Sequence, residues 1–137
     1  RGIDLTGILL LTHGQFCEGI IEGVKMFMGE AEKLECLKLC ADDDVMIYRN
    51  QVADHIKKLD DGDGVLILTD LMGGSPYNVA ASWLIQLSAE CVTGVNLPMV
   101  LEALQAREDM PVQELAEHCI KAATDGIVNV RRHLGLS

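Results

Sequence analysis

Basic residues are scarce in this sequence. It contains 11 lysines and arginines against 21 aspartates and glutamates, which gives a net charge of −10. Proteins that bind nucleic acid need clustered positive charge to neutralise phosphates, so the composition argues against a nucleic-acid partner. The acidity otherwise bears on solubility and identifies no partner.

Long apolar runs are also missing. No stretch approaches the roughly 18 apolar residues that a membrane helix requires, and residues 1–7, RGIDLTG, lack the apolar segment of a signal peptide. We therefore expect a cytoplasmic protein. The chain has no internal repeat or linker. With 137 residues, 49% of them apolar, it can bury a core of its own, and we expect one domain over residues 1–137.

No C-x-x-C motif is present. The five cysteines, at positions 17, 36, 40, 91 and 119, are scattered along the chain. This pattern favours reduced, mostly buried thiols over a disulfide framework. Cys36 and Cys40 could join a histidine on zinc, but their spacing matches no standard zinc site.

Strand and helix patterns alternate along the chain. Continuous apolar runs are typical of strands buried on both faces, and apolar residues at helical spacing predict the helices. The predicted strands cover 7–12, 33–39, 65–69, 91–96 and, as a short last strand, 127–134. The predicted helices cover 16–28, 45–59, about 76–88 after Ser75 as N-cap, a stretch opening at Pro98, and a stretch from Pro111 to about Asp125.

This alternation predicts an α/β fold with three layers: a mostly parallel sheet with helices on both faces, joined by right-handed crossovers. In the flavodoxin-like strand order 2-1-3-4, strands 1 and 3 are neighbours, and a crevice opens at their carboxyl ends. His13 ends the first strand and Asp70 follows the third. The two residues should therefore meet in the crevice, although 57 positions separate them.

A carboxylate beside an imidazole has a definite chemical effect. By accepting a hydrogen bond from one ring N–H it fixes the tautomer and leaves the other nitrogen nucleophilic. It also stabilises the positive charge that develops when the histidine attacks an electrophile. Asp70 is placed to do this for His13.

The surroundings of this pair favour an anionic substrate group. Gly14 begins the turn into the first helix and the GGSP stretch begins the third, so two helix N-termini should point at the crevice. Gly73 and Gly74 let backbone approach a ligand, and the Ser75 hydroxyl can donate to a phosphoryl oxygen. Together the residues predict a phosphohistidine site.

Each residue also has a purely structural interpretation. A histidine at a strand end can be an ordinary polar residue, Asp70 can cap a turn, and Gly-Gly can permit a tight connection. For each residue taken by itself, the structural interpretation is preferred. The convergence of these residues at one crevice favours the functional interpretation. We place three histidines (His55, His118 and His133) at the surface, and Arg107 at the C-terminal end of the fourth helix as a partner of its dipole.

The residues that carry this prediction also resemble a known family. The segments LLLTHG (9–14), GVLILTDLMGGSPYNVA (64–80) and GVNLPMVLEAL (94–104) are similar, in order and spacing, to enzyme IIA of the mannose family of the phosphoenolpyruvate-dependent sugar phosphotransferase system. The resemblance covers Gly7 to about residue 134. Its most specific part is a strand leading into D-x-x-G-G-S-P-x-N.

The resemblance implies that His13 takes a phosphoryl group on Nε2 from the phosphocarrier protein HPr and passes it to enzyme IIB. Membrane subunits then take up the sugar, so contact with the membrane is indirect. The residue that matches Asp70 binds the other ring nitrogen, and Ser75 matches a serine near the phosphoryl group. No cofactor and no metal are implied. The family is usually a homodimer that exchanges its final strand, for which residues 127–134 are the candidate.

Two positions depart from the family pattern. Gln15 and Met72 stand near positions where family members often carry bulky aromatic residues. This affects the expected contacts with HPr or enzyme IIB and leaves the chemistry of His13 unchanged.

Three other kinds of protein share part of this pattern. A receiver domain needs an acidic pair after its first strand and a lysine after its last parallel strand, where this chain has Thr12-His13 and GVNLP. A regulatory, non-transport IIA-like domain that senses phosphorylation would share the fold. The phosphotransfer subunit of dihydroxyacetone kinase is not expected to carry GGSPYN. The motifs offer no second carboxylate or metal set to activate water, so transfer rather than hydrolysis is expected.

Overall fold

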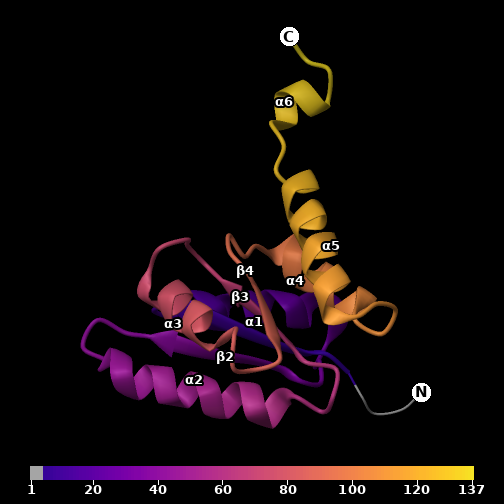
Figure 1. The fold of residues 1–137 in the computed structure, drawn as a ribbon. Helices are drawn as coiled ribbons and strands as arrows, with labels where there is room; N and C mark the ends of the chain where they lie inside the picture. The colour runs from indigo at the N-terminus through magenta and orange to yellow at the C-terminus, as the bar shows by residue number, and fades with distance from the viewer. Residues whose placement is uncertain (1–4) are drawn as a thin grey trace.

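The structure is a computed structural model that describes residues 5–137 (Figure 1). Its strands are β1 (Gly7–His13), β2 (Leu34–Leu39), β3 (Val65–Thr69) and β4 (Ala89–Val92). Its helices are α1 (Phe16–Met28), α2 (Val45–Leu59), α3 (Ser75–Trp83), α4 (Leu97–Ala106), α5 (Val112–Asp125) and α6 (Val130–His133). Residues 1–4, part of the stretch in which we expect no signal peptide, lie outside the described residues. No helix within 5–137 is long and apolar enough to cross a bilayer.

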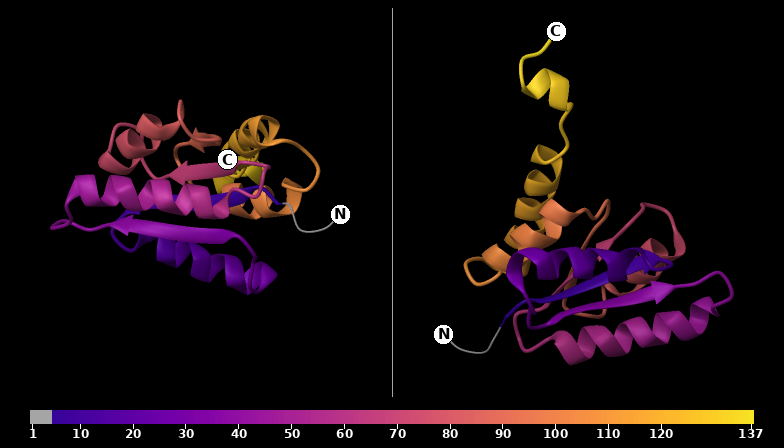
Figure 2. Two further views of the ribbon diagram at one scale, coloured as in Figure 1. Left: turned by 60° about the horizontal axis from the view of Figure 1, so that its bottom comes forward. Right: turned by 180° about the vertical axis from the view of Figure 1, so that it is seen from behind.

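The predicted strand order is confirmed. All four strands are parallel and lie in the order β2-β1-β3-β4. Every residue of β3 is buried, whereas β2, the more alternating strand, forms one edge of the sheet. Parallel neighbours must be joined by crossovers, and the helices that form these crossovers cover both faces (Figure 2).

The core has two halves, one on each face of the sheet. Alternate residues of β1 divide between them, because successive side chains of a strand point to opposite faces. Ile8 and Leu10 belong to the cluster formed with α1, α4 and α5, while Leu9 and Leu11 pack with α2 and α3. His13 shares its parity with Leu9 and Leu11, so it ends β1 on the α3 side.

Two predicted elements are shifted. Helix α3 ends at Trp83 rather than near residue 88; beyond it the backbone bonds tighten to a spacing of three residues, from the Leu84 N–H to the Ala81 carbonyl and from the Gln86 N–H to the Trp83 carbonyl. The fourth strand covers Ala89–Val92 rather than 91–96. The chain bends after it at Gly94, whose φ of 78° is left-handed, and the Val95 N–H donates to the Thr69 carbonyl of β3.

The predicted final strand at 127–134 is wrong for this chain. Its middle forms α6, whose first turn is capped by the Asn129 side chain through a bond from the Arg132 N–H. A strand needs a neighbouring strand for its backbone bonds, and residues 127–137 project beyond α5, away from the sheet (Figure 1). We call residues 127–137 the C-terminal arm.

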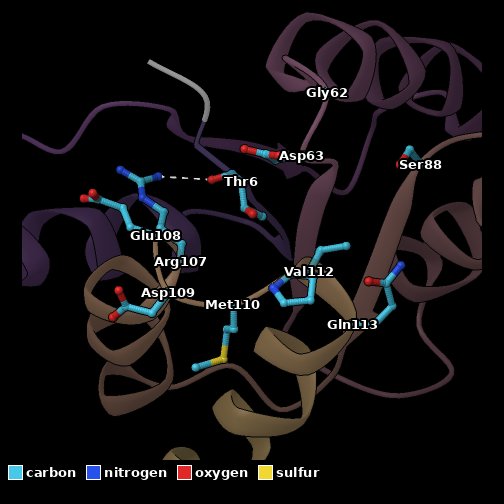
Figure 3. A pocket seen from close by; sticks show the side chains of 11 residues that line it. Thr6, Gly62, Asp63, Ser88, Arg107, Glu108, Asp109, Met110, Val112 and Gln113 are labelled. Carbon is cyan, nitrogen blue, oxygen red and sulfur yellow. Dashed lines mark hydrogen bonds between the residues drawn. The ribbon is translucent and has the colours of Figure 1, made fainter. Parts of the chain in front are cut away.

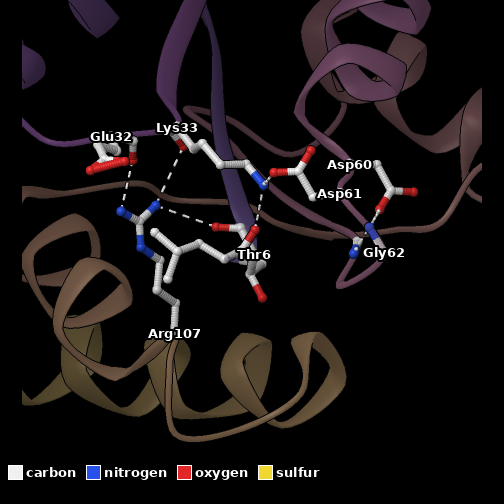
Figure 4. A network of polar contacts seen from close by, with 9 residues as sticks. Thr6, Glu32, Lys33, Asp60, Asp61, Gly62 and Arg107 are labelled. Atoms are coloured by element: carbon white, nitrogen blue, oxygen red, sulfur yellow. Dashed lines mark hydrogen bonds and ion pairs between the residues drawn. The ribbon is translucent and has the colours of Figure 1, made fainter. Parts of the chain in front are cut away.

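Arg107 follows the end of α4 as expected, but its side chain does more than complement the helix dipole. Only 7% of it is exposed, and its guanidinium donates to the carbonyls of Thr6, Glu32 and Lys33 at 2.7–3.4 Å (Figure 4). The Lys33 ammonium in turn pairs with Asp61 at 2.8 Å. Arg107 therefore ties the α4–α5 turn to the starts of β1 and β2, at the end of the sheet opposite His13.

Candidate functional site

His13 and Asp70 meet at the carboxyl ends of the two central strands, as expected. Leu11 of β1 is paired with Thr69 of β3, so His13 at the end of β1 and Asp70 just after β3 lie near each other. One carboxylate oxygen of Asp70, Oδ2, accepts from the backbone N–H of His13 and from its ring Nδ1, each at 2.9 Å. These two bonds fix the imidazole as the Nδ1–H tautomer and leave Nε2 with its lone pair.

The carboxylate stays ionised because of this contact. Burial by itself would raise the pKa of Asp70, but the bonds from the backbone N–H and ring N–H of His13 outweigh it and hold that pKa below its usual value. The Asp70 side chain is 13% exposed and the His13 side chain 48%. The acid is thus held within the protein while the ring faces outward, where a second molecule can reach Nε2.

The turn after His13 is built by its neighbours on both sides. Thr12 is fully buried, and its hydroxyl accepts from the Cys17 N–H at 2.9 Å, which caps the start of α1. Gly14 has a left-handed φ of 56°, and its N–H donates to the Leu39 carbonyl at 2.8 Å. Neither N–H is free for a phosphoryl oxygen, so Gly14 serves the turn itself. The role of Thr12 could not be predicted, because a bond across five residues matches no standard capping spacing.

The N-terminus of α3 lies against the imidazole. A Cβ placed on Gly74 would come 2.7 Å from Cε1 and 3.1 Å from Nε2 of His13, so any other residue there would have to displace the imidazole. Gly74 also takes the N-cap position that we expected of Ser75, and no side chain caps this helix among the described residues. The first turn therefore offers backbone N–H groups to an anion, although Pro76 contributes none.

The other predicted anion-binding residues surround Gly74. Gly73 adopts a left-handed φ of 90°, which glycine tolerates, and Ser75 is the partly buried first residue of α3. Gln15 and Met72, the two departures from the family pattern, are both exposed next to the site. They lie on the surface that a protein partner of His13 would meet.

The remaining histidines are not part of this site. His55 pairs with Glu35 at 2.8 Å and His118 with Glu102 at 2.6 Å, both partly buried, and His133 is exposed in α6. Within residues 5–137 no group of three or more histidine, cysteine or acidic side chains is arranged to hold a metal ion.

Two cavities of about 470 Å³ are not lined by His13 or Asp70, although Gln15, two residues after His13, lines one of them. One is an apolar groove between α1 and the loop before α4, lined by Phe16, Ile20 and Leu97 among others. The other is polar and lies at the opposite end of the sheet, beside Thr6, Arg107 and Gln113 (Figure 3). The His13 side chain is instead open at the surface, where 48% of it is exposed.

Comparison with known proteins agrees with this geometry. Residues 7–120 match the EIIA-man family model, described as the PTS system fructose IIA component. The chain is 31% identical over 122 residues to the mannose-specific EIIAB component of Escherichia coli K12; the match covers 88% of this chain and 38% of that protein. This chain thus spans about two fifths of that relative.

Two further proteins are similar over most of their length. The fructose-specific EIIA component of Bacillus subtilis 168 is 29% identical, with 81% of this chain and 77% of that protein covered. The crystal structure of the PTS IIA protein associated with the fucose utilization operon from Streptococcus pneumoniae superposes with a TM-score of 0.86 at 29% identity, covering 98% of this chain and 99% of that one. The chain belongs to the EIIA-man family of sugar phosphotransferase system IIA components.

Proposed function

We propose that His13 is a phosphoryl carrier that accepts the group from phosphorylated HPr and passes it to enzyme IIB. The observation that carries the proposal is a pair of hydrogen bonds: one Asp70 oxygen accepts from both the backbone N–H and the Nδ1–H of His13. Nε2 is then left beside the start of α3, which no side chain caps. Membership of the family supplies the partners, and it makes the chain a component of a sugar phosphotransferase system.

The transfer would proceed by in-line displacement at phosphorus. The Nε2 lone pair attacks the phosphoryl group, the bond from phosphorus to the donor histidine breaks, and the donor ring keeps the electron pair. The His13 ring becomes cationic, and Asp70, ionised and 2.9 Å from Nδ1, stabilises that charge. The backbone at Gly73, Gly74 and Ser75 would hold the phosphoryl oxygens. Transfer to enzyme IIB reverses these steps with a new nucleophile.

We also propose that the protein acts in the cytoplasm as a homodimer, with the C-terminal arm of one copy covering the other. Its five large apolar side chains are each more than half exposed; they are Ile127, Val128, Val130, Leu134 and Leu136. A segment with this many exposed apolar side chains is costly in water and is typical of an interface. The whole of residues 1–137 would form one IIA-type domain with this arm.

The direct test is to supply phosphoenolpyruvate, enzyme I and HPr and to map the modified residue by mass spectrometry at alkaline pH, where phosphohistidine survives. We expect one adduct on His13 that requires HPr and is absent in His13→Gln. An adduct on Asp70 that needs only magnesium and a small phosphodonor would instead make the protein a receiver-like regulator. Rapid loss of phosphate without an acceptor would make it a hydrolase.

A further inference from the structure

Thr12 is a polar residue at the end of an apolar stretch of β1. The four residues before it, Ile8 to Leu11, are fully buried, and so is Thr12. A hydroxyl buried without a partner costs free energy, so a threonine here needs a hydrogen bond. The Thr12 hydroxyl has one, because it accepts from the backbone N–H of Cys17 at 2.9 Å. Thr12 shares its parity with Ile8 and Leu10, so this bond lies on the face of the sheet that α1 covers.

The spacing of this bond is unusual. A serine or threonine that caps a helix ordinarily occupies the N-cap and accepts from an N–H two or three residues ahead, so the chain before the helix stays free. In α1 the N-cap is Gln15, whose side chain makes no capping bond within residues 5–137. Thr12 instead reaches forward by five residues. The hydrogen bond therefore closes a ring that contains His13, and it fixes the start of α1 relative to the end of β1.

Two further bonds hold the same turn. The backbone N–H of His13 donates to Asp70 at 2.9 Å, and that of Gly14 donates to the Leu39 carbonyl at 2.8 Å. The turn is thus tied to the ends of β3 and β2, and through Thr12 to α1. Cys17 is fully buried, so water can replace the hydroxyl at its N–H only if the turn opens.

We propose that Thr12 is a positioning residue for phosphoryl transfer at His13. Its hydroxyl keeps the turn from β1 into α1 closed, and the closed turn limits the directions in which the His13 ring can point. Nε2 then stays beside the start of α3, where the backbone can hold phosphoryl oxygens. The Thr12 side chain lies on the opposite face of the sheet, so it acts through His13 and not on the phosphoryl group. This proposal rests on the proposed function.

Two substitutions separate the hydroxyl from the rest of the side chain. Thr12→Val keeps the shape and removes the hydroxyl, whereas Thr12→Ser keeps the hydroxyl. In Thr12→Val we expect the rate of phosphoryl acceptance at saturating phosphorylated HPr to fall about tenfold, since small misplacements of reacting groups carry such costs. The KM for phosphorylated HPr should change by less than about twofold, because the surface that meets the partner is kept. Thr12→Ser should retain at least about half of the wild-type rate.

A second readout needs no partner. Nitrogen chemical shifts of the His13 ring report its tautomer, which is fixed while Nδ1–H bonds to Asp70. We expect one tautomer in wild type and Thr12→Ser, and a mixture in Thr12→Val. Arg107→Met is the control for lost stability, because Arg107 contacts the starts of β1 and β2 at the other end of the sheet. At a temperature where it is folded, it should keep the wild-type rate and ring shifts.

Several results would overturn the proposal. Thr12→Val with the wild-type rate and ring shifts would show that the hydroxyl does not position His13, and Thr12→Ser as slow as Thr12→Val would assign the effect to the methyl group. A raised KM with an unchanged saturating rate would place the effect in partner binding. If Thr12→Val does not fold, Thr12→Ala takes its place with the same expectations, and failure of both to fold would give Thr12 a role in the fold alone.

The proposed function can fail separately. If the wild-type protein accepts no phosphoryl group from phosphorylated HPr, the proposed function falls. The ring shifts of wild type, Thr12→Ser and Thr12→Val then decide whether Thr12 positions the His13 ring.

Discussion

The backbone of Gly74 lies against the imidazole of His13, so close that a Cβ there would sit 2.7 Å from Cε1 and 3.1 Å from Nε2. This contact joins the start of α3 to the nitrogen that Asp70 leaves free. A helix N-terminus, which is well suited to hold an anion, therefore lies beside Nε2.

Gly74→Ala should therefore abolish function without unfolding the protein. The added methyl group must displace the ring, and we expect phosphoryl acceptance to fall by about 10²-fold or more. Transfer from phosphorylated HPr measures the loss, and nitrogen chemical shifts of the His13 ring report its displacement without a partner. Gly19→Ala is the control, because a Cβ at Gly19 meets no atom within 4 Å. A fully active Gly74→Ala would show that the His13 imidazole does not accept the phosphoryl group in the position seen in this structure.

Asp70→Asn should separate orientation from charge. The amide oxygen can still accept from the backbone and ring of His13, but it carries no charge to stabilise the phosphorylated ring. We expect phosphoryl acceptance to fall by about 10²- to 10⁴-fold while the fold is kept. The control Asp42→Asn makes the same change in an exposed turn. Near-normal transfer in Asp70→Asn would mean that Asp70 only orients the ring.

Much of the site could be predicted because its causes lie along the chain. Apolar runs locate β1 and β3, and the rules for parallel sheets make them neighbours. His13 and Asp70 follow those two strands directly, so their meeting requires no knowledge of packing. The glycine pair before α3 is a local signal of the same kind.

The features that could not be predicted depend on distant contacts. Arg107 is buried because three carbonyls from two other loops surround it, and nothing in its own neighbourhood in the sequence indicates this. The C-terminal arm has the composition of a strand but no strand beside it within the chain. Its conformation in the structure is set by the Asn129 cap instead.

Arg107→Met should destabilise the protein. The substitution keeps most of the apolar stem but leaves the carbonyls of Thr6 and Glu32 without the guanidinium donor, whereas the Lys33 carbonyl still accepts from the Ile8 N–H. Buried groups left unpaired cost about 1–3 kcal/mol each at most, and we expect a total loss on the order of 3 kcal/mol in the free energy of unfolding. Urea unfolding measures it. Lys57→Met, at an exposed position of α2, should change stability by less than about 0.5 kcal/mol. Equal effects would contradict a structural role for Arg107.

Glu35 should contribute to acid sensitivity. Burial alone would raise its pKa, but hydrogen bonds from His55 and Lys58 outweigh burial and hold that pKa below its usual value. The folded protein then binds fewer protons than the unfolded chain, so this stabilisation is complete above the free carboxyl pKa of about 4.3 and is lost as the pH falls through the lower folded value. Unfolding measured from pH 6 to pH 3 should show a shallower decline in Glu35→Gln than in wild type. Glu117→Gln, at an exposed position, should follow wild type. If stability declines with pH at the same slope in all three proteins, Glu35 does not contribute to the acid sensitivity.

The C-terminal arm should decide the oligomeric state. Val130 and Leu134 lie one helical turn apart, and both are exposed, by 63% and 62%. If a second copy covers them, Val130→Asp combined with Leu134→Asp places two charges in an apolar interface and should yield monomers at concentrations where wild type is dimeric. Sedimentation equilibrium gives the mass of each. Arg132→Asp is the control, since residue 132 points to another side of the same short helix. A monomeric wild type, or a double variant that remains dimeric, would show that the arm does not join two copies.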